Sequence, residues 1–236
     1  MEYHCEKCND VGGFVYSSDE GYLMWQECGC GKVRKALARL QSSGLGQLLK
    51  LYTFKTFKVE SDWQKDAFDK AKGFVDGTDK WFFISGQSGA GKSHLCTAIS
   101  RELLLGQQKS FKFMQWLDDG NRLKRNAMDS ELFDSLMSEL KEVDVLYIDD
   151  FFKSDNNAKP TPADIKLANE ILNYRYNTAR TSKDRLITII STERTIEQLI
   201  SYDEALAGRI IEMSKPNSFV QLIGKEKNYR LKYKEK

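Results

Sequence analysis

The segment Gly86–Ser93 narrows most strongly what this chain of 236 residues can fold into. It reads Gly-Gln-Ser-Gly-Ala-Gly-Lys-Ser and matches the pattern G-x-x-x-x-G-K-[ST] in full. The apolar run Trp81–Ser85 precedes it, and Ser93–Leu105 follows with its leucines and isoleucine on one helical face. A buried strand, a glycine-rich loop and an amphipathic helix, in this order, predict a phosphate-binding loop. The alternative, a glycine-rich turn with an incidental lysine, does not explain that order.

Each part of this loop has a chemical task in holding ATP or ADP. Glycines let successive main-chain N–H groups point at the phosphates, and the start of the helix adds the positive end of its dipole. The ammonium group of Lys92 should reach the β- and γ-phosphates, and the Ser93 hydroxyl should ligate Mg²⁺. We expect contacts with the nucleotide from every position of the loop and the residue after it: Gly86, Gln87, Ser88, Gly89, Ala90, Gly91, Lys92, Ser93 and His94.

A second acidic element completes the pattern of a nucleotide hydrolase. The apolar run Val143–Ile148 ends in Asp149 and Asp150. Ligands bind at the carboxyl ends of strands in parallel sheets, so Asp149 should hold Mg²⁺, directly or through water. Asp150 should polarise the attacking water, but many such ATPases have the longer glutamate there, which predicts slow turnover here. Two solvent-facing aspartates at a strand end are the alternative.

Strands and helices alternate along most of the chain. This alternation predicts an α/β fold with a central, parallel, five-stranded sheet covered by helices on both faces. The predicted strands are 81–85, 111–113, 143–148, 186–190 and 219–223. Helices are predicted in 63–74, 93–105, 160–180 and 195–206, and the segment 117–140 is predicted to be part helix and part loop.

The first 40 residues differ from the rest, because they are rich in glycine and hold four of the five cysteines. Cys5-x-x-Cys8 and Cys28-x-Cys30 are separated by 19 residues, and two close cysteine pairs suit tetrahedral zinc. Zinc would replace an apolar core that so short a stretch cannot build. Free thiols or a redox pair are the alternatives, and His4 is a competing ligand. We therefore divide the chain into a zinc module with a linker helix, 1–46, and an ATPase domain, 47–236.

Composition sets the remaining limits. No apolar run approaches the roughly 20 residues of a membrane span, and the first residues lack a signal-peptide pattern, so we expect a cytoplasmic protein without membrane partners. The net charge is only +2, but seven basic and two acidic residues lie between Lys215 and Lys236. A basic tail suits a polyanion, although a solvated tail explains it equally well.

Several stretches together resemble the DnaC/DnaI-type helicase loaders and their IstB-like relatives in the AAA+ superfamily. The cysteine pairs, with Cys5–Gly12 in particular, look like the amino-terminal zinc module of the DnaI branch. Ser43–Leu45, followed by Thr53, Phe54 and Phe57, is similar to the entry into the family's ATPase domain, and Asn173–Tyr176 is similar to its N-x-R-Y helix. The combination indicates a loader encoded by a phage or mobile element.

The resemblance implies further site residues. Strand 186–190 leads to the place of sensor 1, where Thr192 is the preferred candidate because Glu193 replaces the usual amide. Leu206–Ile210 resembles the arginine-finger box, which implies that Arg209 enters the ATP site of a neighbouring subunit. Arg230 stands where a sensor-2-like arginine is expected. Arg175 is expected at a subunit interface.

The same resemblance implies the partners and the task. Subunits with bound ATP would assemble into a homo-oligomer and load a hexameric, replicative DnaB-type helicase onto single-stranded DNA. Basic Arg122, Lys124 and Arg125, with Phe113 and Trp116 nearby, suit single-stranded DNA, although a charged helix with core aromatics reads the same way. Two other functions remain open: an IstB-like transposition helper ATPase, and a protein that inhibits the host loader by mimicry.

Overall fold

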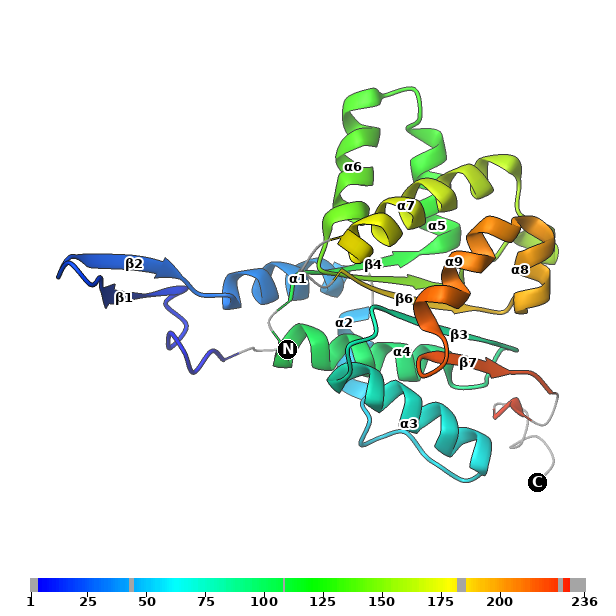
Figure 1. The fold of residues 1–236 in the computed structure, drawn as a ribbon, viewed down its shortest axis with the longest axis horizontal. Coiled ribbons are helices and arrows are strands. Elements are labelled where there is room, and N and C mark those ends of the chain that lie inside the picture. Colours follow the sequence, from blue (N-terminus) through cyan, green and yellow to red (C-terminus); the bar gives the residue numbers. More distant parts are fainter. Residues whose placement is uncertain (1–3, 43–44, 108, 182–185, 225–226, 230–236) are drawn as a thin grey trace.

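Five parallel strands form the centre of the molecule in the order β4-β5-β6-β3-β7 (Figure 1). The structure is a computed structural model that describes residues 4–42, 45–107, 109–181, 186–224 and 227–229. The predicted five-stranded parallel sheet is confirmed. Its strands are β3 (Trp81–Gly86), β4 (Phe111–Gln115), β5 (Val145–Asp149), β6 (Ile187–Thr192) and β7 (Phe219–Leu222).

Helices cover both faces of this sheet, because side chains alternate between the faces along every strand. On β3, Phe82 and Ile84 enter one apolar core, and Trp81 and Phe83 enter the other. The first core lies under α2 (Leu45–Leu51), α3 (Asp62–Asp76) and α4 (Lys92–Arg101). The second lies under α5 (Trp116–Arg125), α6 (Ser130–Glu142), α7 (Pro162–Thr181), α8 (Ile196–Tyr202) and α9 (Glu204–Ser214).

Two predicted helices are broken or extended. The helix expected over 195–206 is two helices, because Asp203 is extended and its carboxylate caps the N–H of Leu206 at 2.9 Å. The segment 117–140, predicted to be part helix and part loop, contains α5 and α6, and Asp129 caps α6. The helix after the phosphate-binding loop continues from α4 into a π-helical turn, Glu102–Gly106. Elsewhere in the chain, a short 3₁₀ turn, Asp155–Asn157, precedes α7.

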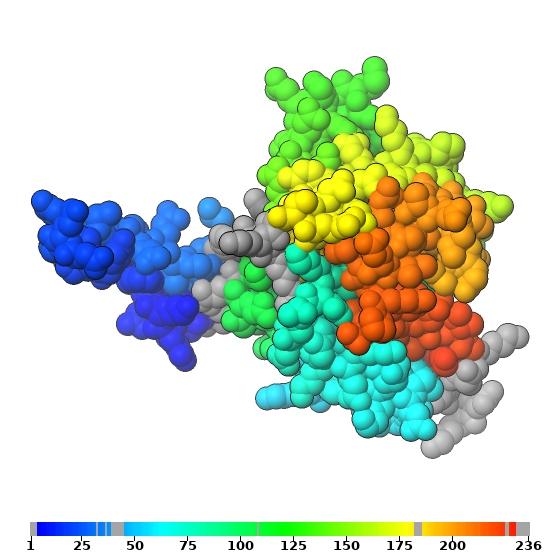
Figure 2. Space-filling view, in the orientation of Figure 1, coloured from blue at the N-terminus to red at the C-terminus, as the bar shows by residue number. Residues whose placement is uncertain are grey.

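An antiparallel hairpin that the sequence analysis did not predict lies between the two cysteine pairs. It consists of β1 (Gly13–Ser17) and β2 (Leu23–Glu27), and α1 (Cys30–Ser42) connects it to the body of the molecule. Figures 1 and 2 show the hairpin projecting away from the sheet and its helices. Val33 and Leu37 of α1 are buried in the same apolar core as α2 and α4.

Arg175 lies inside the protein, and the expectation that it faces a subunit interface is wrong. Its side chain on α7 is fully buried. The Nε atom donates to the Thr188 hydroxyl at 2.9 Å, and the two Nη atoms donate to carbonyl oxygens at the end of α6 and on β6: Leu140, Lys141, Val143 and Ile187. Burial lowers the pKa of this guanidinium to about 9. Arg175 therefore joins two helices to the sheet.

None of the helices that the structure describes combines the length and the apolarity needed to cross a bilayer.

Candidate functional site

A cavity of about 480 Å³ opens beside the phosphate-binding loop. Residues from Ser88 to His94 line it, together with charged side chains from other elements. Aromatic side chains from the segment before α3 and from near the end of the chain complete the wall. Besides the loop, the lining residues are Tyr52, Thr56, Phe57, Lys58, Trp63, Gln64, Asp150, Lys153, Glu193 and Tyr229.

Two glycines of the loop occupy positions that a side chain would obstruct. Gly91 has φ = +86° at the start of α4, and a Cβ atom there would lie 3.1 Å from the Phe57 ring. Gly86 has φ = +150°, and its Cβ would lie 2.4 Å from the carbonyl oxygen of Leu222. The backbone can curl around a phosphate only because these positions lack side chains.

Lys92 is buried and bonded to the main chain of its own loop. Only 6% of its surface is exposed, and its Nζ donates to the carbonyl oxygens of Gly86 at 2.7 Å and Gln87 at 2.9 Å. Burial lowers the pKa of the ammonium group, an effect that the carboxylates of Glu193, Asp150 and Asp149 oppose. The geometry places a positive charge over the loop that would cradle the phosphates.

The structure brings together the two groups predicted to hold magnesium. Asp149 is the last residue of β5, and the Ser93 hydroxyl donates to its Oδ1 at 3.4 Å. The hydroxyls of Tyr147, at 2.7 Å, and of Ser191 donate to the same oxygen. A hydroxyl and a carboxylate facing each other suit Mg²⁺ with its remaining waters. Tyr147 and Ser191 orient the carboxylate, and no sequence signal singled them out.

Asp150 lies on a strained turn next to a cation that the sequence analysis missed. Its φ of +54° is uncommon for a residue with a side chain, and such strain persists where the surroundings hold it. The N–H of Asp150 donates to Ser191 Oγ at 3.3 Å. The Nζ of Lys153 lies 2.6 Å from Asp150 Oδ2, and this bond raises the pKa of the lysine.

The two sensor-1 candidates point in different directions. Thr192 is fully buried, and its hydroxyl donates to the carbonyl oxygen of Phe151 at 2.7 Å. It also accepts the N–H of Arg194 at 3.0 Å. Glu193 instead lines the cavity. The structure therefore directs Thr192 into the loop after β5 and Glu193 toward the nucleotide site.

His94, on the helix that follows the loop, packs against the aromatic residues Tyr52 and Phe57 of the cavity wall. Its ring stacks on Tyr52 with centroids 4.6 Å apart, and its Nε2 donates to the carbonyl oxygen of Thr53 at 3.0 Å. Phe57 meets the same ring edge-on at 5.1 Å. Burial lowers the pKa of His94, which favours the neutral ring in this role. The aromatic side chains themselves were not predicted as part of the site.

Arg209 is not among the residues that line the cavity of its own chain. It lies on α9 above the Tyr176 ring, 5.8 Å from the ring centroid. Its Nη1 atom is buried and has no hydrogen-bond partner within the described residues. A guanidinium with an unpartnered Nη1 atom, outside the cavity lining of its own chain, is compatible with the predicted role in a neighbouring subunit. Arg230 lies outside the described residues.

The predicted base-stacking role of Trp116 is wrong. Only 3% of its surface is exposed, because the ring packs edge-on against Phe151, with centroids 4.9 Å apart, and against Phe152. Lys124 donates to Asp164 at 2.6 Å. Arg122 and Arg125 on the same helix are exposed.

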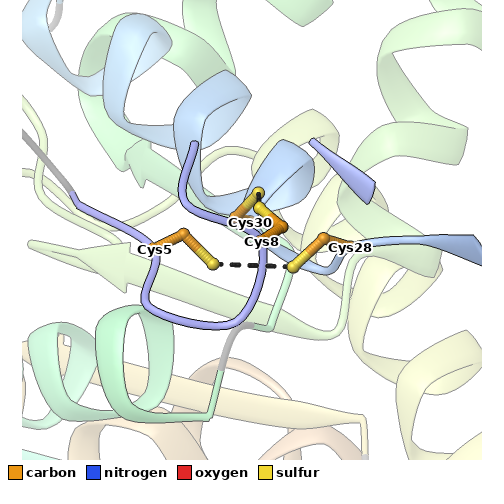
Figure 3. Close-up of side chains that lie close together, drawn as sticks. All are labelled: Cys5, Cys8, Cys28 and Cys30. Carbon is orange, nitrogen blue, oxygen red and sulfur yellow. Dashed lines mark hydrogen bonds between the residues drawn. The ribbon is translucent and has the colours of Figure 1, made fainter. Parts of the chain in front are cut away.

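The four amino-terminal cysteines form a candidate metal centre (Figure 3). Their sulfur atoms all lie within 4.8 Å of one another, with Cys5 and Cys28 3.5 Å apart and Cys8 and Cys30 3.4 Å apart. Tetrahedral zinc with bonds of about 2.3 Å places sulfurs about 3.8 Å apart, so the set fits Zn²⁺. His4 bonds to Asp10 at 2.6 Å, and Asp10 also accepts the N–H of Cys5. The histidine thus supports the cysteines from outside the cluster. The fifth cysteine, Cys96, is a buried core residue of α4, as predicted.

Comparison with known proteins decides the family. Residues 48–212 match the family described as the bacterial DnaA ATPase domain. The chain is a member of the DnaA-type ATPases. The match covers most of the chain and begins after the cysteine cluster.

Two curated relatives place this DnaA-type ATPase more closely. It is 33% identical over 222 residues to the phage-like element PBSX protein XkdC of Bacillus subtilis (strain 168), which covers 89% of this chain and 79% of XkdC. It is 32% identical over 153 residues to the replicative helicase loader DnaC of Escherichia coli (strain K12), which covers 58% of this chain and 61% of DnaC. The predicted kinship with DnaC-type loaders is confirmed.

Solved structures show the same AAA+ fold. The crystal structure of the DnaC helicase loader superposes on this DnaA-type ATPase with a TM-score of 0.61 at 22% identity, covering 72% of this chain and 96% of that one. The replication initiator DnaA bound to AMPPCP and single-stranded DNA gives a TM-score of 0.58 at 20% identity, covering 78% and 55%.

Proposed function

We propose that this protein is an ATP-dependent loader that places a hexameric, DnaB-type replicative helicase on single-stranded DNA during DNA replication. The proposal rests on the presence of an ATPase domain and a cysteine module in the same chain. A DnaA-type ATPase domain with a complete phosphate-binding loop is joined to a four-cysteine module with an exposed apolar hairpin. Homology to the DnaC loaders supports the assignment, and homology to a phage-like element protein supports a phage or mobile-element origin.

The motor of this loader is a Mg²⁺-dependent, slow ATPase. The loop amides and Lys92 bind the phosphates, and Ser93 with Asp149 would hold Mg²⁺, which supplies Lewis-acid neutralisation of the phosphate oxygens. Asp150 polarises the attacking water, and its short side chain makes turnover slow. Arg209 of a neighbouring subunit completes the site, so ATP-bound subunits form a homo-oligomer.

The helicase-binding part is the module of residues 1–46, and residues 47–236 form the ATPase domain. The hairpin presents unusually large apolar surfaces to solvent: Leu23 is 79%, Val15 58% and Trp25 56% exposed. Contiguous exposed apolar surface marks a site of protein–protein contact. Zinc bound by the cysteines would hold the base of the hairpin, so the apolar side chains stay presented without a core of their own.

Binding to the host's replicative helicase tests this proposal. Size-exclusion chromatography and calorimetry should show a complex with the wild-type protein in the presence of ATP. Leu23→Ser and Trp25→Ser should weaken helicase binding at least about tenfold, since each removes buried apolar area at the centre of the contact. Met128→Ser is the control, because Met128 is 98% exposed but lies away from the hairpin. Absence of a wild-type complex, with and without ATP, would refute the loader function.

Contact with single-stranded DNA is the remaining part of the proposal. Arg122 and Arg125 are exposed on α5, and we assign them to phosphate contacts without base stacking. A solved structural relative of the same fold, DnaA, is described as bound to single-stranded DNA. Replacing both arginines by glutamine should weaken binding of an oligonucleotide and flatten its dependence on salt concentration. An unchanged salt dependence would exclude this surface.

A further inference from the structure

Lys153 lines the nucleotide cavity. Neither phosphate binding by the loop nor magnesium binding by Ser93 and Asp149 involves this lysine. Its Nζ is paired with Asp150 Oδ2 at 2.6 Å, and the carboxylates of Asp149 and Glu193 also act on its charge. The side chain of Lys153 is 46% exposed, whereas that of Asp150 is 23% exposed. The ammonium group is thus paired with Asp150 in the cavity wall and is partly open to solvent.

The backbone below Lys153 is firmly held, which fixes the place from which its side chain reaches. The N–H of Lys153 donates to the carbonyl oxygen of Asp150 at 2.8 Å, and Phe152 beside it is buried with φ = +58°. The buried guanidinium of Arg194 donates to several groups of the same loop: Phe152 O at 3.3 Å, Ser154 Oγ at 3.3 Å, Asn157 O at 3.2 Å and Ala158 O at 2.7 Å. Such a support preorganises a side chain for a ligand.

Two carboxylates in the cavity wall, those of Asp150 and Glu193, call for a cation near the terminal phosphate of ATP. Glu193 lines the cavity with a negative charge, and Asp150 adds a second. Both would repel the terminal phosphate of ATP, whose charge must be neutralised for phosphoryl transfer. Lys92 lies over the phosphate-binding loop, bonded to Gly86 and Gln87. Lys153 supplies positive charge from the opposite element, the loop after β5.

We propose that Lys153 is a second phosphate-binding lysine, specific for the terminal phosphate of ATP. When ATP binds, its Nζ leaves Asp150 and bonds an oxygen of the γ-phosphate. The released Asp150 carboxylate then accepts a proton from the attacking water. The water oxygen bonds to the γ-phosphorus as the bond to the bridging oxygen breaks, and that oxygen leaves with ADP. This inference rests on the proposed ATPase function and adds a catalytic residue to it.

Binding of AMPPCP and of ADP to the full-length protein, each with Mg²⁺ and measured by calorimetry, tests the inference. Lys153→Met should weaken AMPPCP at least about tenfold while ADP binding stays within about twofold, because only AMPPCP carries the third phosphate. Lys153→Arg should restore most of the preference. Lys159→Met is the control, since this exposed lysine follows in the same loop and does not line the cavity.

The variant Asp150→Asn separates direct contact from an indirect effect. If Lys153 touches phosphate, adding Lys153→Met to Asp150→Asn should again lose AMPPCP affinity and spare ADP. If Lys153 acts only by positioning Asp150, the second change should have no effect, and the inference is overturned. Equal loss of both nucleotides in Lys153→Met would overturn it as well. Failure of the wild-type protein to bind either nucleotide would instead refute the proposed ATPase function itself.

Discussion

The Nζ atom of Lys92 lies 2.7 Å from the carbonyl oxygen of Gly86, so the lysine folds back over the loop that carries it. The Nζ atom thus bonds two main-chain oxygens of the loop, those of Gly86 and Gln87. ATP must exchange these main-chain acceptors for phosphate oxygens, which are better partners for an ammonium group.

Replacing Lys92 by methionine should abolish nucleotide binding without unfolding the protein. The phosphates lose a charged contact, so affinity for ATP should fall at least about a hundredfold. The unfolding free energy should change by only about 1 kcal/mol, because the carbonyl oxygens of Gly86 and Gln87 lose a donor while the buried ammonium group no longer has to be desolvated. Calorimetry and urea unfolding measure the two quantities. Lys50→Met, at an exposed position on α2, should change neither, and ATP affinity unchanged in Lys92→Met would contradict the assignment.

Replacing Arg175 by methionine should destabilise the fold strongly. The change leaves buried carbonyl oxygens of α6 and β6 without donors, for example those of Leu140 and Ile187. We expect a loss of about 3 kcal/mol in the unfolding free energy, measured with urea. Arg180→Met on the same helix is the control. Arg180 is exposed and donates to the Tyr176 hydroxyl at 2.8 Å, so its loss should cost less than about 1 kcal/mol.

Loss of a single cysteine of the cluster should abolish zinc binding and leave ATP binding unchanged. We expect the purified protein to carry one zinc ion per chain and the Cys28→Ser variant to carry none, since three thiolates do not hold a structural site. ATP affinity should stay within about twofold, because the cavity is lined by residues from Tyr52 onward. Cys96→Ala should keep its zinc, because Cys96 lies in α4 and not in the cluster. Metal analysis and calorimetry give the two readings, and a zinc-free wild-type protein would exclude the metal centre.

Arg209 should act on the ATP of a neighbour. Arg209→Ala should bind ATP normally but lose most of its hydrolysis, about a hundredfold or more, since an arginine finger neutralises charge in the transition state. Lys92→Met should be inactive because it binds no ATP. A mixture of the two variants should recover part of the steady-state rate, because the second variant supplies an intact Arg209 to the ATP held by the first. A mixture as inactive as its parts would contradict transfer between subunits.

Much of the ATPase domain was predictable because its signals are local or follow from sheet geometry. Gly86–Ser93 specifies a strand, a loop and a helix within a short stretch of chain. Parallel strands place their carboxyl ends at one edge, so Ser93 and Asp149 were expected together and lie together.

Other features depend on packing that the sequence does not display. Side chains alternate along a strand, so a difference of one position separates Thr192, turned inward, from Glu193 at the cavity. Trp116 lies near basic residues in the sequence, which suggests base stacking, but in the structure its ring packs against Phe151 and Phe152. The hairpin was not predicted because its apolar residues face solvent and build no core. The zinc site and the division into two domains stay predictions.

Helix α1 begins at Cys30 of the cysteine cluster, and its Val33 and Leu37 are buried in the same apolar core as Leu95 of α4. The cysteine cluster and the helix that follows the phosphate-binding loop are thus coupled through one continuous apolar core. A force applied to the hairpin would therefore be transmitted to α4 through packed side chains.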